Sequence, residues 1–391
     1  MFAGFGCTYA FGAFFISLET EFQAARAEVA AVFSYAAAVI FIAGAFSGPL
    51  SDRIGAKPVV ALGTLGMMAG LWMSAQADSI ESVSLWFMLG MGGGLGFVYV
   101  PAIGTVQRWF FIRRGMASGL AVTGIGLGTF LMPVIAGQLL LSIDWRHVFE
   151  MMAMLIAVLC FPALNFLDSD PLKFGLHPDG AADDPRGANP GNESQSLREI
   201  LLSRAFIQFY IASVILSFAI MAPFVHLAPY AVDAGVPGHL AATLVGCIGI
   251  GSTIGRLLVG GLADRFGRLP SLVALFVAMG LAYLWWLGAT TYPLLVAFAI
   301  FYGTAYGGSI ALMPAILADY FGGPKLSSVI GLQYTSAAPG SLGGPIIAGA
   351  IFDYSGSYSV WLVAGAAICV TSAALMATTP RPMLATCTAN A

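Results

Sequence analysis

The sequence predicts an all-α membrane protein with twelve transmembrane helices in two six-helix repeat halves. Three observations predict this class. Of the 391 residues, 59% are apolar and only 9% are charged, whereas a soluble domain carries about 25% charged residues. Apolar stretches of about 20 residues, each long enough to cross a bilayer, follow one another along the chain. One sequence pattern also returns after a constant interval, which indicates two related halves.

The apolar stretches define the expected spans in order. In the first half they are residues 1–18, 29–50, 58–77, 84–107, 115–141 and 147–167. In the second half they are residues 205–231, 240–262, 270–289, 292–318, 327–352 and 358–379. The region between them is rich in Pro, Gly, Asp and Asn and predicts a polar linker. The predicted organisation is an N-terminal half (1–168), a cytoplasmic linker (169–204), a C-terminal half (205–380) and a cytoplasmic tail (381–391).

Basic residues are distributed unevenly between the two sides of the membrane. Of the 16 Lys and Arg residues, thirteen fall in even-numbered loops or the C-terminal tail, whereas only Arg26 and Arg146 fall in odd-numbered loops. Loops rich in Lys and Arg stay in the cytoplasm. The sequence therefore predicts a multi-pass protein of the cytoplasmic (inner) membrane, with both termini and the linker on the cytoplasmic side.

The internal repeat has an offset of 212 positions. The segment GPLSDRIGAKP at 48–58 returns as GGLADRFGRLP at 260–270, and the same offset pairs Gly119 with Gly331. Matches in several helices at one offset indicate two six-helix halves in parallel repeat, with a substrate site near the midplane between them. The glycine-rich faces of the fifth and eleventh helices predict helices that slide during gating.

Arg256 is the one basic residue inside an expected span, and it is the first candidate for function. A cation at the bilayer centre costs about 2.5–3.5 kcal/mol, so it must face a cavity or a partner. Arg256 lies eight residues before Asp264, or ~12 Å along a helix, which places it near the midplane. The repeat aligns it with Gly44, so the fold does not require a cation there.

No acidic residue lies inside a span to neutralise Arg256. The acidic residues nearest the spans are all at span ends: Glu19, Glu28, Glu150, Asp168, Asp233, Asp319 and Asp353. We therefore expect Arg256 to bind a substrate carboxylate through both arms of its guanidinium, rather than to pair with a neighbouring helix.

His226 is the one histidine inside a span. It can carry a proton, donate a hydrogen bond to substrate, or pack between helices near the outer end of the seventh span. The sequence leaves these alternatives open.

Charged residues at the ends of the second and eighth spans predict a gating latch. Each Asp can interact with the positive N-terminal end of a helix in the opposite half. The expected latch residues are Asp52, Arg53, Asp264, Arg265 and Arg108.

The repeated loop pattern resembles the signature loop of the major facilitator superfamily. Entering the fifth span, the segment WFFIRRGMASGLAVTG at 109–124 resembles the monocarboxylate transporter family. The segment PFVHLAPY at 223–230 and a single Arg in the eighth span are similar to bacterial members, the monocarboxylate permeases and oxalate–formate antiporter-like proteins. Mammalian relatives carry an Asp one turn before this Arg, where this chain has Ser252.

The resemblance implies the major facilitator fold and further substrate contacts. Tyr9, Tyr99, Tyr306 and Tyr334 fall in the four helices that line the cavity in this superfamily. A hydroxyl on an aromatic body suits a small acid with a polar head and an apolar tail, although each tyrosine can also be a packing residue.

The expected function is secondary active transport of a small, lactate- or pyruvate-like monocarboxylate by alternating access. By resemblance we expect coupling to a proton, in a monomer that needs the lipid bilayer but no nucleic acid, metal or cofactor. The alternative is an organic-anion exchanger, oxalate/formate-like or for aromatic acids, without proton coupling. One central cation and the absence of a basic residue from 331–351 disfavour a dicarboxylate. No catalytic cluster or phosphate-binding loop at usable spacing indicates an enzyme or ATP drive.

Overall fold

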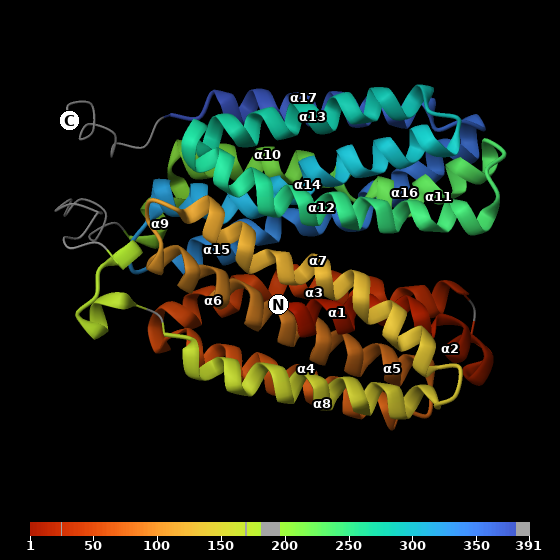
Figure 1. Cartoon of the computed structure of the whole chain (residues 1–391), viewed down its shortest axis with the longest axis horizontal. Helices are drawn as coiled ribbons and strands as arrows, with labels where there is room; N and C mark the ends of the chain where they lie inside the picture. The colour runs from red at the N-terminus through yellow and green to blue at the C-terminus, as the bar shows by residue number, and fades with distance from the viewer. Residues whose placement is uncertain (25, 169, 181–195, 381–391) are drawn as a thin grey trace.

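The computed structural model describes residues 1–24, 26–168, 170–180 and 196–380. The regular structure of these residues is entirely helical. The helices form two elongated bundles that lie side by side, one from each half of the chain (Figure 1). The expected tail and residues 181–195 of the expected linker lie outside the described residues.

The N-terminal bundle contains the first six expected spans. Its elements are α1 (Phe2–Tyr9), η1 (Ala10–Phe14), α2 (Phe15–Phe22), α3 (Arg26–Ile54), α4 (Ala56–Ala75), α5 (Ile80–Phe87), the π-helical η2 (Met88–Gly93), α6 (Gly94–Trp109), α7 (Arg114–Leu139), α8 (Trp145–Ala163) and η3 (Leu164–Phe166). The first span is longer than expected and is interrupted by the 3₁₀ turn η1.

The linker and the C-terminal bundle follow. The elements are η4 (Pro171–Phe174), η5 (Pro178–Gly180), α9 (Leu197–Leu202), α10 (Arg204–Ile220), α11 (Ala222–Asp233), α12 (Gly238–Phe266), α13 (Arg268–Gly288), α14 (Tyr292–Phe321), α15 (Leu326–Tyr334), η6 (Thr335–Ala337), α16 (Ala338–Ser355) and α17 (Ser359–Ala377). Ten helical segments of the described chain are long and apolar enough to cross a membrane. The first and eleventh spans, which are broken helices, complete the twelve.

The eleventh span is broken where its repeat partner is continuous. Pro339 lies just after η6 and has no N–H to donate to the carbonyl of Thr335. The aligned residue in α7 is Leu127, which continues the helix. The span expected as one helix over 327–352 is therefore two helices joined by a short turn.

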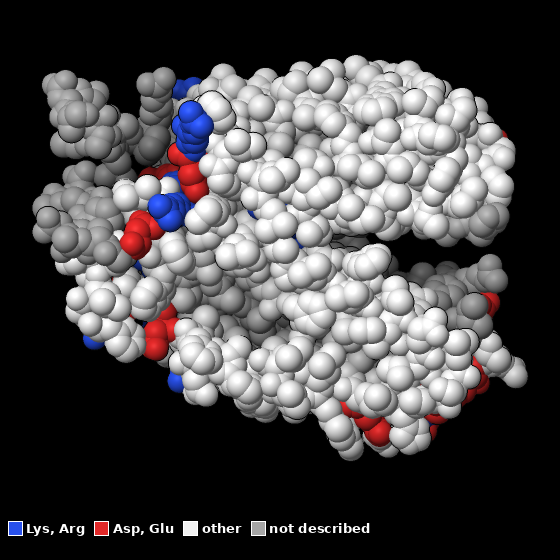
Figure 2. Space-filling model, viewed as in Figure 1, with Lys and Arg blue, Asp and Glu red and all other residues white. Residues whose placement is uncertain are grey.

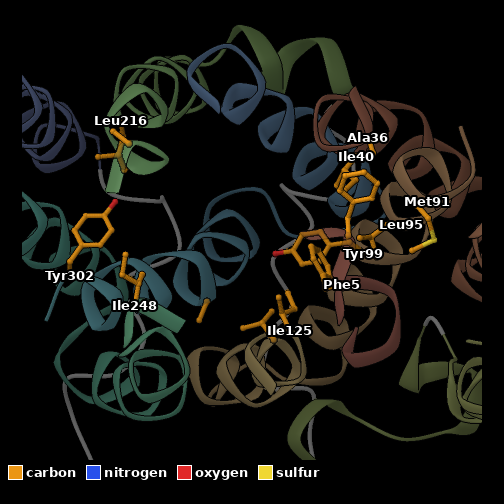
Figure 3. Close-up of a cluster of buried hydrophobic side chains, with 14 of the residues drawn as sticks. Phe5, Ala36, Ile40, Met91, Leu95, Tyr99, Ile125, Leu216, Ile248 and Tyr302 are labelled. Atoms are coloured by element: carbon orange, nitrogen blue, oxygen red, sulfur yellow. The ribbon is translucent and has the colours of Figure 1, made fainter. Parts of the chain in front are cut away.

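The seventh span is broken between α10 and α11. Pro223 cannot donate to the carbonyl of Ala219, and the break leaves the carbonyl of Ile220 without its helical partner. Two fully buried tyrosines replace the missing donors: the Tyr283 hydroxyl donates to Ala219 (2.5 Å) and the Tyr302 hydroxyl to Ile220 (2.8 Å). Figure 3 shows the Tyr302 hydroxyl directed at α10, the helix that carries Leu216. The break is thus fully hydrogen-bonded.

The two halves meet closely at one end of the molecule, which we call the closed end. There α3 crosses α15, and α7 crosses α12, at glycines that allow backbone contact. A Cβ on Gly48 would lie 2.2 Å from the carbonyl oxygen of Ser327, and one on Gly260 would lie 2.3 Å from that of Gly115. At the opposite, open end, Figure 2 shows the halves separated by a deep hollow, while most visible basic side chains gather at the closed end.

Candidate substrate site between the halves

Arg256 lies on α12 at the interface between the halves and is only 5% exposed. Its Nη1 donates a long hydrogen bond, 3.4 Å, to the carbonyl of Val122 on α7 of the other half. Its buried Nε has no hydrogen-bond partner in the described part of the chain, where no carboxylate pairs with this guanidinium either. A buried cation with unused donors is a candidate site for an anion.

Small residues on two neighbouring helices make room for Arg256. A Cβ on Gly255 would lie 2.0 Å from the carbonyl oxygen of Thr304, so α12 is pressed against α14. On the other side, a Cβ on Gly126 would lie 2.2 Å from the Thr253 hydroxyl oxygen and 3.3 Å from Nη1 of Arg256. Gly126 of α7 therefore leaves space beside the guanidinium.

Four tyrosines lie near Arg256. Tyr9, Tyr99, Tyr306 and Tyr334 each lie close enough to interact electrostatically with its guanidinium. We call these five residues the Arg256 cluster. It combines side chains from both halves, and the structure brings together all five of these predicted site residues.

The tyrosines of the Arg256 cluster differ in exposure and packing. Tyr99 is buried and stacks on Tyr334 of the opposite half, with ring centroids 4.8 Å apart. Tyr9 is 43% exposed, whereas residues 3–8 of the same helix are buried. Figure 3 shows the Tyr99 hydroxyl directed into the space between the bundles. The tyrosine pair thus forms an aromatic wall, and Tyr9 lines the accessible space.

His226 lies outside the Arg256 cluster. Its Nε2 is 2.9 Å from the carbonyl oxygen of Pro345, and its Nδ1 is 3.1 Å from the hydroxyl of Tyr358. A neutral ring with its proton on Nε2 donates to Pro345 and accepts from Tyr358. Among the described contacts, none joins His226 to Arg256 or the four tyrosines. The structure places it between α11, α16 and α17, and its role in binding or proton transfer stays a prediction.

At the closed end, Asp52 spans the two halves. Its carboxylate accepts hydrogen bonds from the backbone N–H groups of Ser327 (3.2 Å) and Ser328 (2.7 Å) at the start of α15. It also forms a 2.6 Å ion pair with Arg108 of its own half. A carboxylate at a helix N-terminus is favoured both by the free N–H groups and by the helix dipole.

Asp264 makes the equivalent contact at the repeat position. It accepts hydrogen bonds from the backbone N–H groups of Gly115 and Met116, both 2.9 Å, at the start of α7. These residues align with Ser327 and Ser328. Arg53 and Arg265, predicted as latch residues, have exposed side chains at this end.

Three further charged residues form a network at the closed end that the sequence did not predict. Arg114 is only 5% exposed and pairs with Asp319 at 2.8 Å. Arg268 contacts the same carboxylate at 2.6 and 2.8 Å and donates to Asp264 at 2.8 Å. From the sequence alone, both arginines count only as basic residues of cytoplasmic loops. Asp319 is the one charged residue of α14, and this is the signal that could have identified the network.

Comparison with known proteins agrees with this architecture. The chain matches the family model of the Major Facilitator Superfamily over residues 1–268 and 227–386. It is 31% identical to monocarboxylate transporter 11 of Homo sapiens over 378 residues, covering 93% of this chain and 77% of the relative. It is 27% identical to monocarboxylate transporter 12 of Rattus norvegicus over 395 residues, covering 92% and 79%.

Two solved structures share the fold. The fucose:proton symporter of E. coli superposes with a TM-score of 0.71 at 17% identity, covering 97% of both chains. The proton:xylose symporter bound to 6-bromo-6-deoxy-D-glucose gives 0.76 at 14% identity, covering 98% of this chain and 96% of that one. By its fold, its internal repeat and these relatives, the chain belongs to the major facilitator superfamily and, within it, to the monocarboxylate transporters, which are membrane transporters and not enzymes.

Proposed function

We propose that the protein is a secondary active transporter of small monocarboxylates, lactate- or pyruvate-like, and that Arg256 binds the substrate carboxylate. The observation that carries this proposal is the buried guanidinium between the halves, with a free Nε and no carboxylate partner among the described residues. Such a cation is unfavourable in a low-dielectric interior until an anion neutralises it. Substrate binding therefore lowers the cost of closing the site.

The charge of the site limits the substrate. One cation matches one carboxylate, and residues 331–351 contain no second basic residue. The tyrosine rings offer hydroxyl groups for a polar substituent and apolar faces for a short carbon chain. The names of the relatives, monocarboxylate transporters 11 and 12, support the same substrate class.

The closed and open ends support alternating access. The basic loops lie at the closed end, so the positive-inside rule favours this end as the cytoplasmic one in the inner membrane. In that orientation the Arg256 cluster faces the outside, and the described chain ends near Pro380 on the cytoplasmic side. Met1, in contrast to the expectation of a cytoplasmic N-terminus, lies midway along the N-terminal bundle (Figure 1). Asp52 and Asp264 then act as two latches that release when the cytoplasmic side opens.

By resemblance we expect the transport to be coupled to a proton, with His226 as the candidate carrier. A second candidate function, exchange of organic anions without a proton, is favoured by one observation. Both ring nitrogens of His226 already have partners, away from the Arg256 cluster.

Uptake by reconstituted protein tests the substrate class. We expect labelled small monocarboxylates to accumulate in proteoliposomes, other monoanions to compete, and oxalate or malonate not to compete. Equal competition by a dicarboxylate at matched concentration would overturn the one-cation argument. An imposed pH gradient in the same vesicles distinguishes symport from exchange.

The His226→Gln variant tests the coupling. If His226 carries the proton, this variant loses accumulation driven by a pH gradient but retains exchange of labelled for unlabelled substrate. If accumulation survives, His226 is a packing residue that holds α11 against α16.

A further inference from the structure

The beginning of the linker is docked onto the loop between α6 and α7. The Trp109 indole N–H donates to the carbonyl of Asp168 at 2.7 Å, and its ring packs against Phe174 with centroids 6.4 Å apart. This loop, residues 110–113, faces the C-terminal half at the closed end. The linker therefore contacts a part of the interface that opens and closes.

Asp179 makes the central contact of this docking. Its Oδ2 accepts hydrogen bonds from the backbone N–H groups of Phe111 (2.8 Å) and Ile112 (2.7 Å). Asp179 has a φ of 58°, in the left-handed region that few residues other than Gly, Asn and Asp adopt. The residue that binds the loop therefore has an unfavourable backbone conformation.

The peptide unit between Phe111 and Ile112 is also bound from the opposite side, by the C-terminal half. The carbonyls of Phe111 and Ile112 accept hydrogen bonds from Nη2 of Arg268, at 3.1 and 2.7 Å. Arg268 is held in turn by Asp264 and Asp319. A carboxylate on the N–H groups polarises a peptide unit and strengthens the hydrogen bond to its carbonyl.

We propose that Asp179 is a positioning residue of the transport cycle: it holds the 110–113 loop in the shape that receives Arg268 while the closed end is shut. The linker then stabilises the contacts that Asp264 and Arg268 make across the closed end. The latch at Asp52 has no such support among the described contacts. Loss of the Asp179 charge loosens the loop and shifts the population toward the state in which this end is open. The proposal rests on alternating access, but not on the identity of the substrate.

Distance measurements between spin labels test the proposal on the full chain in a bilayer. Labels replace the native residues at exposed positions Lys57 and Phe266, one on each half at the closed end, in a background without the native cysteines. We expect Asp179→Asn, and equally Asp179→Ala, to raise the ratio of long to short distances about tenfold, the effect of losing one charge-assisted hydrogen bond. The measurement needs no substrate, so it can fail independently of the proposed monocarboxylate transport.

Two further variants distinguish positioning from a general effect on the linker. Asp170→Asn is the matched control, because Asp170 caps Leu172 within the linker, and we expect wild-type distances from it. In an Arg268→Gln background, Asp179→Asn should cause no additional opening, because both residues act through the loop at Phe111 and Ile112 and share the peptide unit between them. Unchanged distances in both Asp179 variants, an equal shift in Asp170→Asn, or additive shifts with Arg268→Gln would each overturn the proposal.

Discussion

Two helix crossings join the halves: α12 crosses α7, and α3 crosses α15. Their backbones are arranged in the same way, but their side chains differ. A Cβ on Gly119 would lie 2.0 Å from the carbonyl oxygen of Arg256, and a Cβ on Gly331 would lie 2.0 Å from that of Gly44. These residues are aligned by the repeat. The backbone contact is therefore a requirement of the fold that both halves retain.

The side chains at the two crossings are distributed in opposite ways. At one crossing the large residue, Arg256, is on α12 and faces Val122 of α7. At the other, the aligned pair is Gly44 on α3 and Tyr334 on α15, whose ring would contact a Cβ on Gly44 at 3.4 Å. One crossing thus supplies the cation and the other an aromatic ring, and both belong to the Arg256 cluster. The two crossings have equivalent backbones, but each contributes a different kind of side chain to the same site.

The largest expected effect follows from changing the cation at the first crossing. Arg256→Lys keeps the charge but loses the planar fork that matches a carboxylate. We expect the uptake rate of the preferred acid to fall by about 30- to 100-fold, the value of one or two charge-assisted hydrogen bonds. Initial rates in proteoliposomes measure the effect.

Tyr334→Phe provides the comparison from the second crossing. This variant keeps the ring that stacks on Tyr99 and removes only a hydroxyl, so we expect a loss of no more than about tenfold. Gel filtration and thermal melting check that both proteins remain folded. Near-normal uptake by Arg256→Lys would remove Arg256 from the binding site.

The second prediction compares the two latches. After Asp264→Asn, Arg268 still has Asp319 at 2.6 and 2.8 Å, whereas after Asp52→Asn, Arg108 retains only Pro324 (3.2 Å) and Ser327 (3.5 Å). We expect Asp52→Asn to raise about tenfold the population of molecules in which the halves have separated at the closed end. We expect Asp264→Asn to raise it only a few-fold. Spin-label distances at Lys57 and Phe266 report both. Equal shifts would mean that Asp319 does not stabilise the latch at Asp264.

The smallest expected effect concerns the space beside Arg256. Gly126→Ala places a Cβ against Thr253 and Nη1 of Arg256, so the guanidinium must move. We expect a rise in KM of roughly three- to tenfold, equivalent to an overpacking cost of about 1 kcal/mol. The aligned residue in the other half is Ala338, and Ala338→Gly should leave KM unchanged. An unchanged KM in Gly126→Ala would show that the site tolerates a displaced guanidinium.

The sequence predicted the parts of the molecule that depend on local composition. Span lengths follow from the apolar stretches, and Arg256 was found because a lone cation in an apolar helix is costly. The breaks in the seventh and eleventh spans were not predicted, since proline also occurs within continuous helices, such as Pro133 in α7. Whether a helix breaks depends on partners that can replace the lost hydrogen bonds, and these are distant in sequence.

The surroundings of His226 could not be predicted from the sequence for the same reason. Its hydrogen-bond partners, Pro345 and Tyr358, lie 119 and 132 residues further along the chain. No local pattern brings them together, so the sequence could not choose between proton transfer and packing. The network of Arg114, Arg268 and Asp319 likewise joins three separate loops and helix ends.

The hydrogen-bonded break in the seventh span also constrains how this protein can evolve. Pro223, Tyr283 and Tyr302 depend on one another, because a proline without the hydroxyls leaves two buried carbonyls unsatisfied, and the hydroxyls without the break lose their acceptors. The residues aligned with the tyrosines in the first half, Leu71 and Gly90, have no hydroxyl. After the ancestral duplication, the three positions are therefore expected to have changed nearly together. A homologue whose seventh helix runs straight should lack all three.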